Sequence, residues 1–211
     1  MRVGVIDYGV GNFGSVLRAL EELRVAPVLV NRAIDMHATD CLVLPGVGNF
    51  ADCINLLQAD GWVDALHQEV NGYNRPLLGI CVGMQLLADA STEGAGDGQV
   101  TPGLGFISGL VQHLRAMGCG LRVPHVGWNS ILRGAVDPLF DGIPDGTDFY
   151  FVHSYALVPQ DPANVLATTD YGVPVTAAVR RGHVWGTQFH PEKSSRAGFR
   201  LLRNFIESPK C

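Results

Sequence analysis

Long apolar stretches and clusters of basic residues are missing from this sequence. No segment approaches the ~20 consecutive apolar residues that a membrane-spanning helix needs, and the opening "MRVGVIDYG" lacks the apolar core of a signal peptide. The net charge is −5, and the Lys and Arg residues do not gather in any one segment. We therefore expect neither a membrane nor a nucleic acid among the partners of this chain.

A cysteine pattern is missing as well. The five cysteines are odd in number, widely spaced and without a C-x-x-C pair. This argues against a disulfide framework and against a structural zinc site, and it favours a reducing cytoplasm. A single cysteine is most often a small buried hydrophobic residue, and we expect no more than that of Cys41, Cys53, Cys119 and Cys211.

What is present suits a compact α/β protein. The 211 residues are 47% hydrophobic and 17% charged, which is enough for one domain with a substantial core. Because the chain has no internal repeat and no linker, we predict a single domain over residues 1–211.

Short apolar runs alternate with helical patterns in the first part of the chain. This alternation predicts parallel strands joined by crossover helices, and unbroken apolar runs suit strands that are covered on both faces. The predicted strands are 2–7, 26–30, 41–46 and 76–80, and the predicted helices are 12–24, 50–60, 61–70 and 82–90. A glycine-rich surface loop follows over 91–105, then strands at 106–114, 147–157, 173–182 and 183–189, and a last helix at 195–208.

The stretch "GICVG" frames Cys81 between Gly79 and Gly83, after a predicted strand and before a predicted helix. This is the spacing of a nucleophile elbow with cysteine in place of serine. The thiol would stand at the carboxyl edge of the sheet, where α/β folds bind ligands, and the helix dipole favours thiolate over thiol. Of the five cysteines, Cys81 is therefore the candidate nucleophile.

The segment "GTQFHPEKS" supplies a candidate base. Among the seven histidines, His190 ends an apolar run, so it too should lie at a strand end. Glu192 follows two residues later, where its carboxylate can turn back to hold the imidazole tautomer. The plainer interpretation is a surface loop with an incidental histidine and glutamate.

A third piece, "LPGVGNF", follows a buried strand and contains Gly46 and Gly48. Glycines let backbone N–H groups turn toward a ligand, and the amide of Val82 after the candidate nucleophile is a natural second donor. The segment therefore predicts an oxyanion hole, with an ordinary strand-to-helix turn as the plainer alternative.

One competing motif is present at Gly9–Gly14, a G-x-G-x-x-G between a predicted strand and a predicted helix. That is the context of the dinucleotide-binding fingerprint, which leaves an NAD-dependent oxidoreductase as an alternative. The acid expected after the next strand is missing, because that strand runs into Asn31 and Asp35 lies beyond it. A glycine-rich turn for packing or partner contact explains the motif equally well.

Taken together and in order, "PGVG", "GICVGMQLL" and "FHPEKS" resemble the motifs of the class I (triad) glutamine amidotransferases. The resemblance covers nearly the whole chain, through "IDYGVGNFGSV", "PHVGWN" and "YFVHSY". It implies a three-layer, flavodoxin-like α/β fold with a central, mostly parallel but mixed sheet and helices on both faces.

The resemblance also implies roles. Cys81 would attack the side-chain amide of L-glutamine, and His190, oriented by Glu192, would transfer the proton. Glu93 would meet the α-ammonium, and the backbone around Ser154 and Tyr155 the α-carboxylate. The full implied set is Cys81, His190 and Glu192 for catalysis, Gly48 and Val82 for the oxyanion hole, Gln85, Glu93, Ser154 and Tyr155 for glutamine, and Trp128, Asn129, Tyr150 and Lys193 for a partner interface. It implies no metal and no other cofactor.

Within the family, the chain is similar to the glutaminase subunits of imidazole glycerol phosphate synthases, which act in histidine biosynthesis. These form a heterodimer with a (β/α)8-barrel cyclase, to which ammonia is channelled, and the complex acts as a lyase-type synthase. The sequence agrees with such a division, because it has no P-loop and no basic nucleotide-binding patch of its own.

Three other uses of the same site stay open at this point. The chain could be a paralogue that feeds ammonia to another acceptor, such as a sugar. It could be a free-standing thiol hydrolase or protease, since an elbow alone does not select glutamine. It could also be a regulatory subunit without activity, against which the intact triad argues.

Overall fold

The structure is a computed structural model that describes residues 1–96 and 98–208, so Cys211 lies outside the described residues. Its main sheet has eight strands in the order β2-β1-β3-β4-β14-β13-β12-β9. The first five are parallel to one another, and the last three continue the sheet antiparallel. Their bounds are β2 (Ala26–Val30), β1 (Arg2–Ile6), β3 (Cys41–Gly46), β4 (Leu77–Cys81), β14 (Val184–Thr187), β13 (Pro174–Arg181), β12 (Val165–Asp170) and β9 (Leu132–Arg133).

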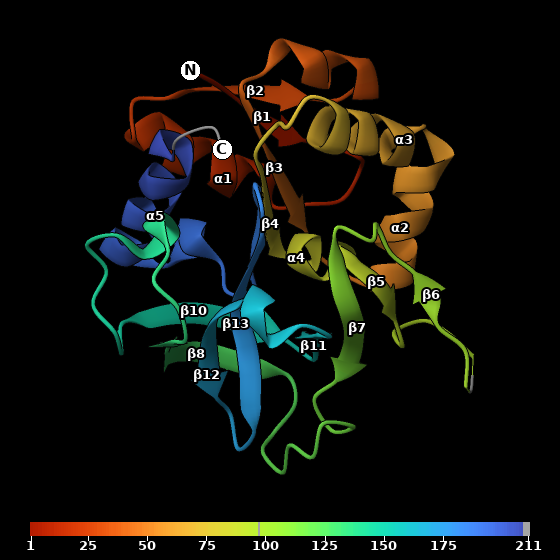
Figure 1. Cartoon of the computed structure of the whole chain (residues 1–211), viewed down its shortest axis with the longest axis vertical. Helices are drawn as coiled ribbons and strands as arrows, with labels where there is room; N and C mark the ends of the chain where they lie inside the picture. Colours follow the sequence, from red (N-terminus) through yellow and green to blue (C-terminus); the bar gives the residue numbers. More distant parts are fainter. Residues whose placement is uncertain (97, 209–211) are drawn as a thin grey trace.

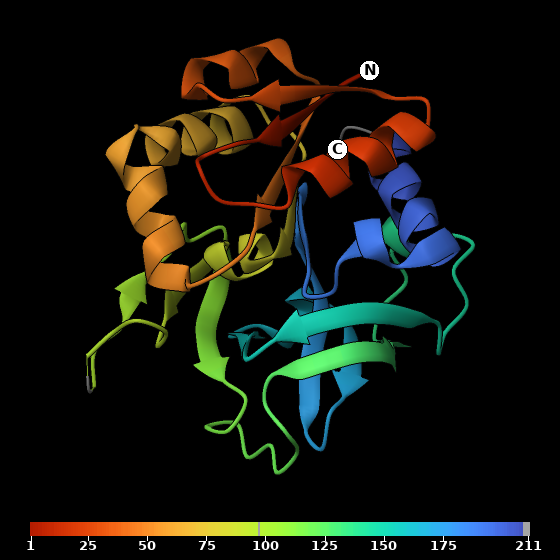
Figure 2. The same ribbon diagram turned by 180° about the vertical axis from the view of Figure 1, so that it is seen from behind.

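Helices cover both faces of this sheet (Figures 1 and 2). Helices α1 (Phe13–Glu22) and α5 (Ser195–Glu207) lie on one face, and α2 (Phe50–Ala59) and α3 (Trp62–His67) lie on the other. Short α4 (Val82–Leu86) follows β4 directly. This arrangement confirms the predicted three-layer α/β fold. The remaining helical turns are Ala33–Ala38, Gln68–Gly72, Pro138–Phe140, Pro162–Asn164 and Pro191–Lys193.

The strands β3 and β4 form the centre of the sheet, and every residue of both is buried. Apolar side chains on both faces are removed from water by the two helix layers, which explains why neither strand alternates in polarity. Because β3, β4 and β14 are adjacent and parallel, their carboxyl ends meet at one edge. The three candidate motifs follow these three strands, so the topology brings them together.

Two smaller sheets lie below that edge (Figure 1). Strands β10 (Asp148–His153) and β8 (His125–Ser130) pair antiparallel. The other sheet has the order β11-β7-β5-β6, with bounds β11 (Tyr155–Pro159), β7 (Ile107–His113), β5 (Ala88–Ser91) and β6 (Thr101–Pro102).

Several predicted elements differ from the structure. The helix predicted over 82–90 ends at Leu86, because Ala88–Ser91 pairs with β7 and tertiary pairing outweighs helix propensity. The single strand predicted over 147–157 is two strands that belong to different sheets and meet at Ser154. The predicted loop over 91–105 contains β6, and strands β8, β9 and β12 were not predicted.

Candidate active site

Cys81 adopts the strained backbone conformation that an elbow requires, with φ +56° and ψ −112°. A positive φ is rare for a residue other than glycine and occurs where the surroundings enforce it. The flanking glycines leave room for this turn. A Cβ on Gly83 would lie 1.8 Å from the carbonyl oxygen of Leu44, and a Cβ on Gly79 would lie 2.6 Å from that of Gly83. Both "GICVG" glycines are therefore steric requirements of the elbow.

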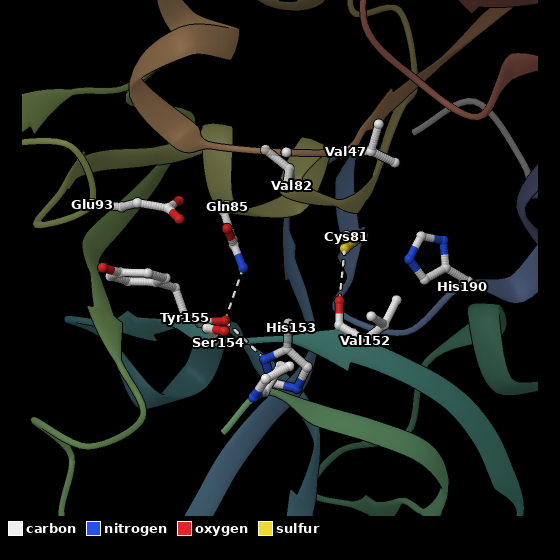
Figure 3. A pocket seen from close by; sticks show the side chains of 12 residues that line it. Val47, Cys81, Val82, Gln85, Glu93, Val152, His153, Ser154, Tyr155 and His190 are labelled. Atoms are coloured by element: carbon white, nitrogen blue, oxygen red, sulfur yellow. Dashed lines mark hydrogen bonds between the residues drawn. The ribbon is translucent and has the colours of Figure 1, made fainter. Parts of the chain in front are cut away.

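A cavity of about 270 Å³ opens beside Cys81. Figure 3 shows Cys81 and His190 at one end of it and Glu93 and Tyr155 at the other, with Gln85 between them. Its lining residues are Val47, Gly48, Cys81, Val82, Gln85, Glu93, Pro124, Val152, His153, Ser154, Tyr155 and His190. The cavity thus brings together the predicted nucleophile, base, oxyanion donors and glutamine-binding residues.

The carboxylate of Glu192 contacts the His190 ring. Its Oε1 lies 2.8 Å from His190 Nδ1, and both side chains are almost fully buried. A carboxylate only accepts hydrogen bonds, so Nδ1 carries a hydrogen and donates it. The backbone around His190 is fixed too, because its N–H donates to the Tyr150 carbonyl and its carbonyl accepts from the Ser194 hydroxyl. The other ring nitrogen, Nε2, is buried and has no hydrogen-bond partner among the described residues.

The electrostatics of this site favour a charged imidazole. Burial lowers the pKa of His190, but the nearby Cys81 and the hydrogen-bonded Glu192 outweigh burial and raise that pKa to about 9. At neutral pH the imidazole therefore holds two protons beside Cys81. A protonated Nε2 next to the candidate nucleophile could give its proton to a departing amine.

Gln188 also contacts Cys81, the candidate nucleophile, and sequence reasoning missed it. Its Nε2 lies 3.8 Å from Cys81 Sγ, and Sγ lies 3.8 Å from the Val152 carbonyl oxygen. A thiol can donate to that carbonyl, whereas a thiolate accepts from the Gln188 amide. The two contacts offer Sγ a partner in each protonation state. The signal in the sequence is position, since Gln188 directly follows β14 and stands two residues before His190.

The predicted oxyanion segment follows β3 directly. Gly48 has φ +98°, a conformation that favours glycine, and the neighbouring Val47 lines the cavity as well. The Val47 carbonyl accepts a hydrogen bond from the Cys53 thiol at 3.6 Å, and Asn49 caps α2. The donor roles of Gly48 and Val82 stay predictions that this placement allows.

Of the predicted glutamine-binding residues, Glu93 and Tyr155 lie at the far end of the cavity, and Gln85 lies between the two ends. Glu93 Oε2 accepts a hydrogen bond from the backbone N–H of Phe50, and burial raises the pKa of its carboxyl despite that bond. Gln85 uses its amide nitrogen within the protein, donating to the carbonyl of Tyr155 at 2.8 Å and to Gln188 Oε1 at 2.9 Å. Only the amide oxygen of Gln85 is left for a ligand.

Three of the four predicted partner residues form one surface. Trp128 pairs across strands with Tyr150, their rings 6.1 Å apart, and Lys193 lies over the Tyr150 ring. Asn129 faces the other way because side chains alternate along a strand. Its amide donates a hydrogen bond to the Asp170 carbonyl at 2.8 Å, so its side chain is bonded within the protein.

The cavity is also lined by residues that the sequence did not single out, namely Val47, Pro124, Val152 and His153. The Gly9–Gly14 turn is not among the lining residues.

Within the part of the chain that the structure describes, no group of three or more His, Cys, Asp and Glu side chains could hold a metal. No helix in residues 1–96 and 98–208 has both the length and the apolar character to cross a membrane.

Comparison with known proteins gives curated relatives over almost the full length. The imidazole glycerol phosphate synthase subunit HisH of Rhodospirillum rubrum is 48% identical over 214 residues, covering 98% of this chain and 98% of the relative. The HisH subunit of Moorella thermoacetica is 46% identical over 205 residues, covering 97% of this chain and 94% of the relative.

Solved structures give the same fold. A crystal structure of a glutamine amidotransferase superposes with a TM-score of 0.74 at 23% identity, over 97% of both chains. The PurLQS structure from Thermotoga maritima gives a TM-score of 0.74 at 18% identity, again over 97% of both chains. The family model "Glutamine amidotransferase class-I" matches residues 4–208. The chain therefore belongs to the class I glutamine amidotransferase family.

Proposed function

We propose that this chain is the glutaminase subunit of an imidazole glycerol phosphate synthase, and that residues 1–211 form one amidotransferase domain. The observation that carries the proposal is the single cavity in which Cys81 and His190 face Glu93 and Tyr155. The curated relatives that bear the HisH name support the choice of synthase. A reducing cytoplasm, which keeps the Cys81 thiol free, suits this chemistry.

In the first half of the reaction, the thiolate of Cys81 attacks the side-chain amide carbon of glutamine. A C–S bond forms, and the amide oxygen gains the negative charge that the backbone N–H groups of Gly48 and Val82 stabilise. The proton on His190 Nε2 passes to the amide nitrogen. The C–N bond then breaks, ammonia leaves, and a γ-glutamyl thioester remains on Cys81.

In the second half, the neutral His190 takes a proton from water. The resulting hydroxide attacks the thioester carbon, the C–S bond breaks, and glutamate leaves while Cys81 returns to the thiolate. Glu192 holds the imidazole in one tautomer through both halves and stabilises its charged form, as the 2.8 Å contact with Nδ1 allows.

The charges of the cavity suit an α-amino acid. Glu93 stands at the end away from Cys81, where its carboxylate can bind the α-ammonium group of the substrate. The backbone of Ser154 and Tyr155 lies beside it and provides N–H donors for the α-carboxylate. A substrate held at both groups extends its side-chain amide toward Cys81.

An exposed apolar surface continues from the cavity and suits a partner subunit. On the outer face of β8 and β10, Trp128 is 52% exposed, Val126 is 56% exposed and Val152, which lines the cavity, is 36% exposed. Apolar groups grouped in this way are typical of protein–protein interfaces, with tryptophan and tyrosine often central. We assign this surface to the (β/α)8 cyclase, which would receive ammonia directly from the cavity.

The test is to mix this chain with the cyclase and to measure glutamate formation with and without the nucleotide substrate. We expect turnover of glutamine to be low for the isolated chain and to rise when both the cyclase and its nucleotide are present. Trp128→Ala should raise the cyclase concentration needed for half of that rise by about tenfold or more. A chain that hydrolyses glutamine fully without the cyclase, or that responds only to a different acceptor enzyme, would contradict the proposal.

A further inference from the structure

Two buried histidines beneath the cavity belong to one chain of hydrogen bonds. His125 Nδ1 lies 3.1 Å from His153 Nε2, and His153 Nδ1 lies 2.8 Å from the Tyr155 carbonyl oxygen. At the other end, the Asn129 amide nitrogen lies 3.4 Å from His125 Nε2. This series of hydrogen bonds therefore runs from β8 to the part of β11 that lines the cavity.

The geometry allows only one arrangement of hydrogens. A carbonyl oxygen only accepts, so His153 Nδ1 must carry a hydrogen, and in a neutral ring its Nε2 is then an acceptor. His125 Nδ1 must in turn be a donor, and its Nε2 accepts from the Asn129 amide. The orientation of that amide is set independently, because its nitrogen also donates to the Asp170 carbonyl and its oxygen accepts from the Ser130 N–H.

The surroundings keep both rings neutral. Burial lowers the pKa of His125 to about 4 and that of His153 to about 3. A proton added to His153 would set two N–H groups against each other at the 3.1 Å contact, and a proton added to His125 would do the same at its 3.4 Å contact with the Asn129 amide. His125 is also held by stacking on Tyr171, with ring centroids 3.9 Å apart, and on Phe151.

This hydrogen-bond chain ends at a bend that no continuous strand ladder supports. Ser154 separates β10 from β11, which lie in different sheets. The Ser154 carbonyl accepts from the Leu114 N–H, and the Tyr155 carbonyl accepts from both His153 and Gln85. The first contact fixes the peptide group that carries the Tyr155 N–H, and the other two fix the peptide group that follows it, so the backbone on both sides of the Tyr155 Cα is held.

We propose that His125 and His153 are positioning residues that hold the Ser154–Tyr155 backbone in the orientation that receives the α-carboxylate of glutamine. This inference rests on the proposed function. His153 acts directly on the Tyr155 carbonyl, and His125 acts through His153. Because the α-carboxylate is bound equally before and during the reaction, the pair sets the affinity for glutamine rather than the rate of bond breaking.

Two variants of His125 separate the hydrogen bond from the packing. His125→Phe keeps a ring for stacking on Tyr171 and removes the donor. His125→Asn loses the ring but places an amide nitrogen where Nδ1 was, so the donor to His153 is kept. We would measure glutamine affinity by calorimetry in a Cys81→Ala background, where nothing turns over, and KM and kcat in the otherwise unchanged chain bound to the cyclase.

We expect His125→Phe to raise both the Kd and the KM for glutamine about tenfold, with kcat changed less than about twofold. His125→Asn should recover most of that loss, and the control His67→Phe, which lies in α3, should change neither. The opposite order, with Phe binding better than Asn, would show a packing role and overturn the inference. Failure of the Cys81→Ala chain to bind glutamine at all would instead count against the proposed function.

Discussion

Replacing Cys81 with alanine should lower glutamine hydrolysis by ~10⁵-fold or more, because it removes the atom that forms the covalent bond. The position is specific to this residue, since the strained elbow at φ +56° directs one side chain into the cavity. Glutamate release by the complex with the cyclase is the measurement. The smaller alanine side chain should leave the fold unchanged, which circular dichroism checks.

The same variant supplies its own control. Synthesis from ammonium salts, measured in the complex with the cyclase, should continue at the wild-type rate, since ammonia then reaches the second site without hydrolysis. If Cys81→Ala also stopped synthesis from ammonium, the division of the reaction between two sites would be wrong. If glutamine hydrolysis survived, Cys81 would not be the nucleophile.

The second large effect is expected at His190. His190→Asn should lower kcat for glutamine by about 10⁴-fold, because an amide can neither give a proton to the departing nitrogen nor take one from water. The pKa of about 9 means that the wild-type ring is charged at neutral pH, so the variant also loses a positive charge beside Cys81. Steady-state kinetics in the complex measure the loss.

His67→Asn is the matched control for that variant. His67 lies in α3, away from the cavity, and should keep full activity. A fall in kcat of less than tenfold in His190→Asn, with His67→Asn unchanged, would mean that another group moves the proton. The other imidazole that lines the cavity is that of His153, whose ring is buried and neutral and is hydrogen-bonded to the Tyr155 carbonyl.

Local patterns were enough to predict the half of the fold that carries Cys81. The apolar runs of β3 and β4 are buried on both faces, so their composition alone identifies them as central parallel strands. The glycines around Cys81 also mark the elbow in the sequence, because close backbone contacts at Gly79 and Gly83 leave no room for a side chain. Glu192 was found from its spacing to His190, which needs only a short turn.

The second half of the chain depends on pairings that are distant in sequence. β8 and β10 form their own two-stranded sheet, and nothing in "HVGWNS" alone separates it from a loop. The apolar "DFYFVHSYAL" resembles one strand, yet its two halves join different sheets. The contact of Gln188 with Cys81 and the His125–His153 pair join residues that are far apart in sequence, so only the folded chain brings them together.

The sharpest test of covalent catalysis at Cys81 is acid quenching of the complex during steady glutamine turnover, followed by mass spectrometry of its peptides. We expect one γ-glutamyl group, held as a thioester and released by hydroxylamine, on the peptide that contains Cys81. An adduct on any other residue, or rapid turnover in which no adduct forms on Cys81 even with saturating glutamine, would contradict it.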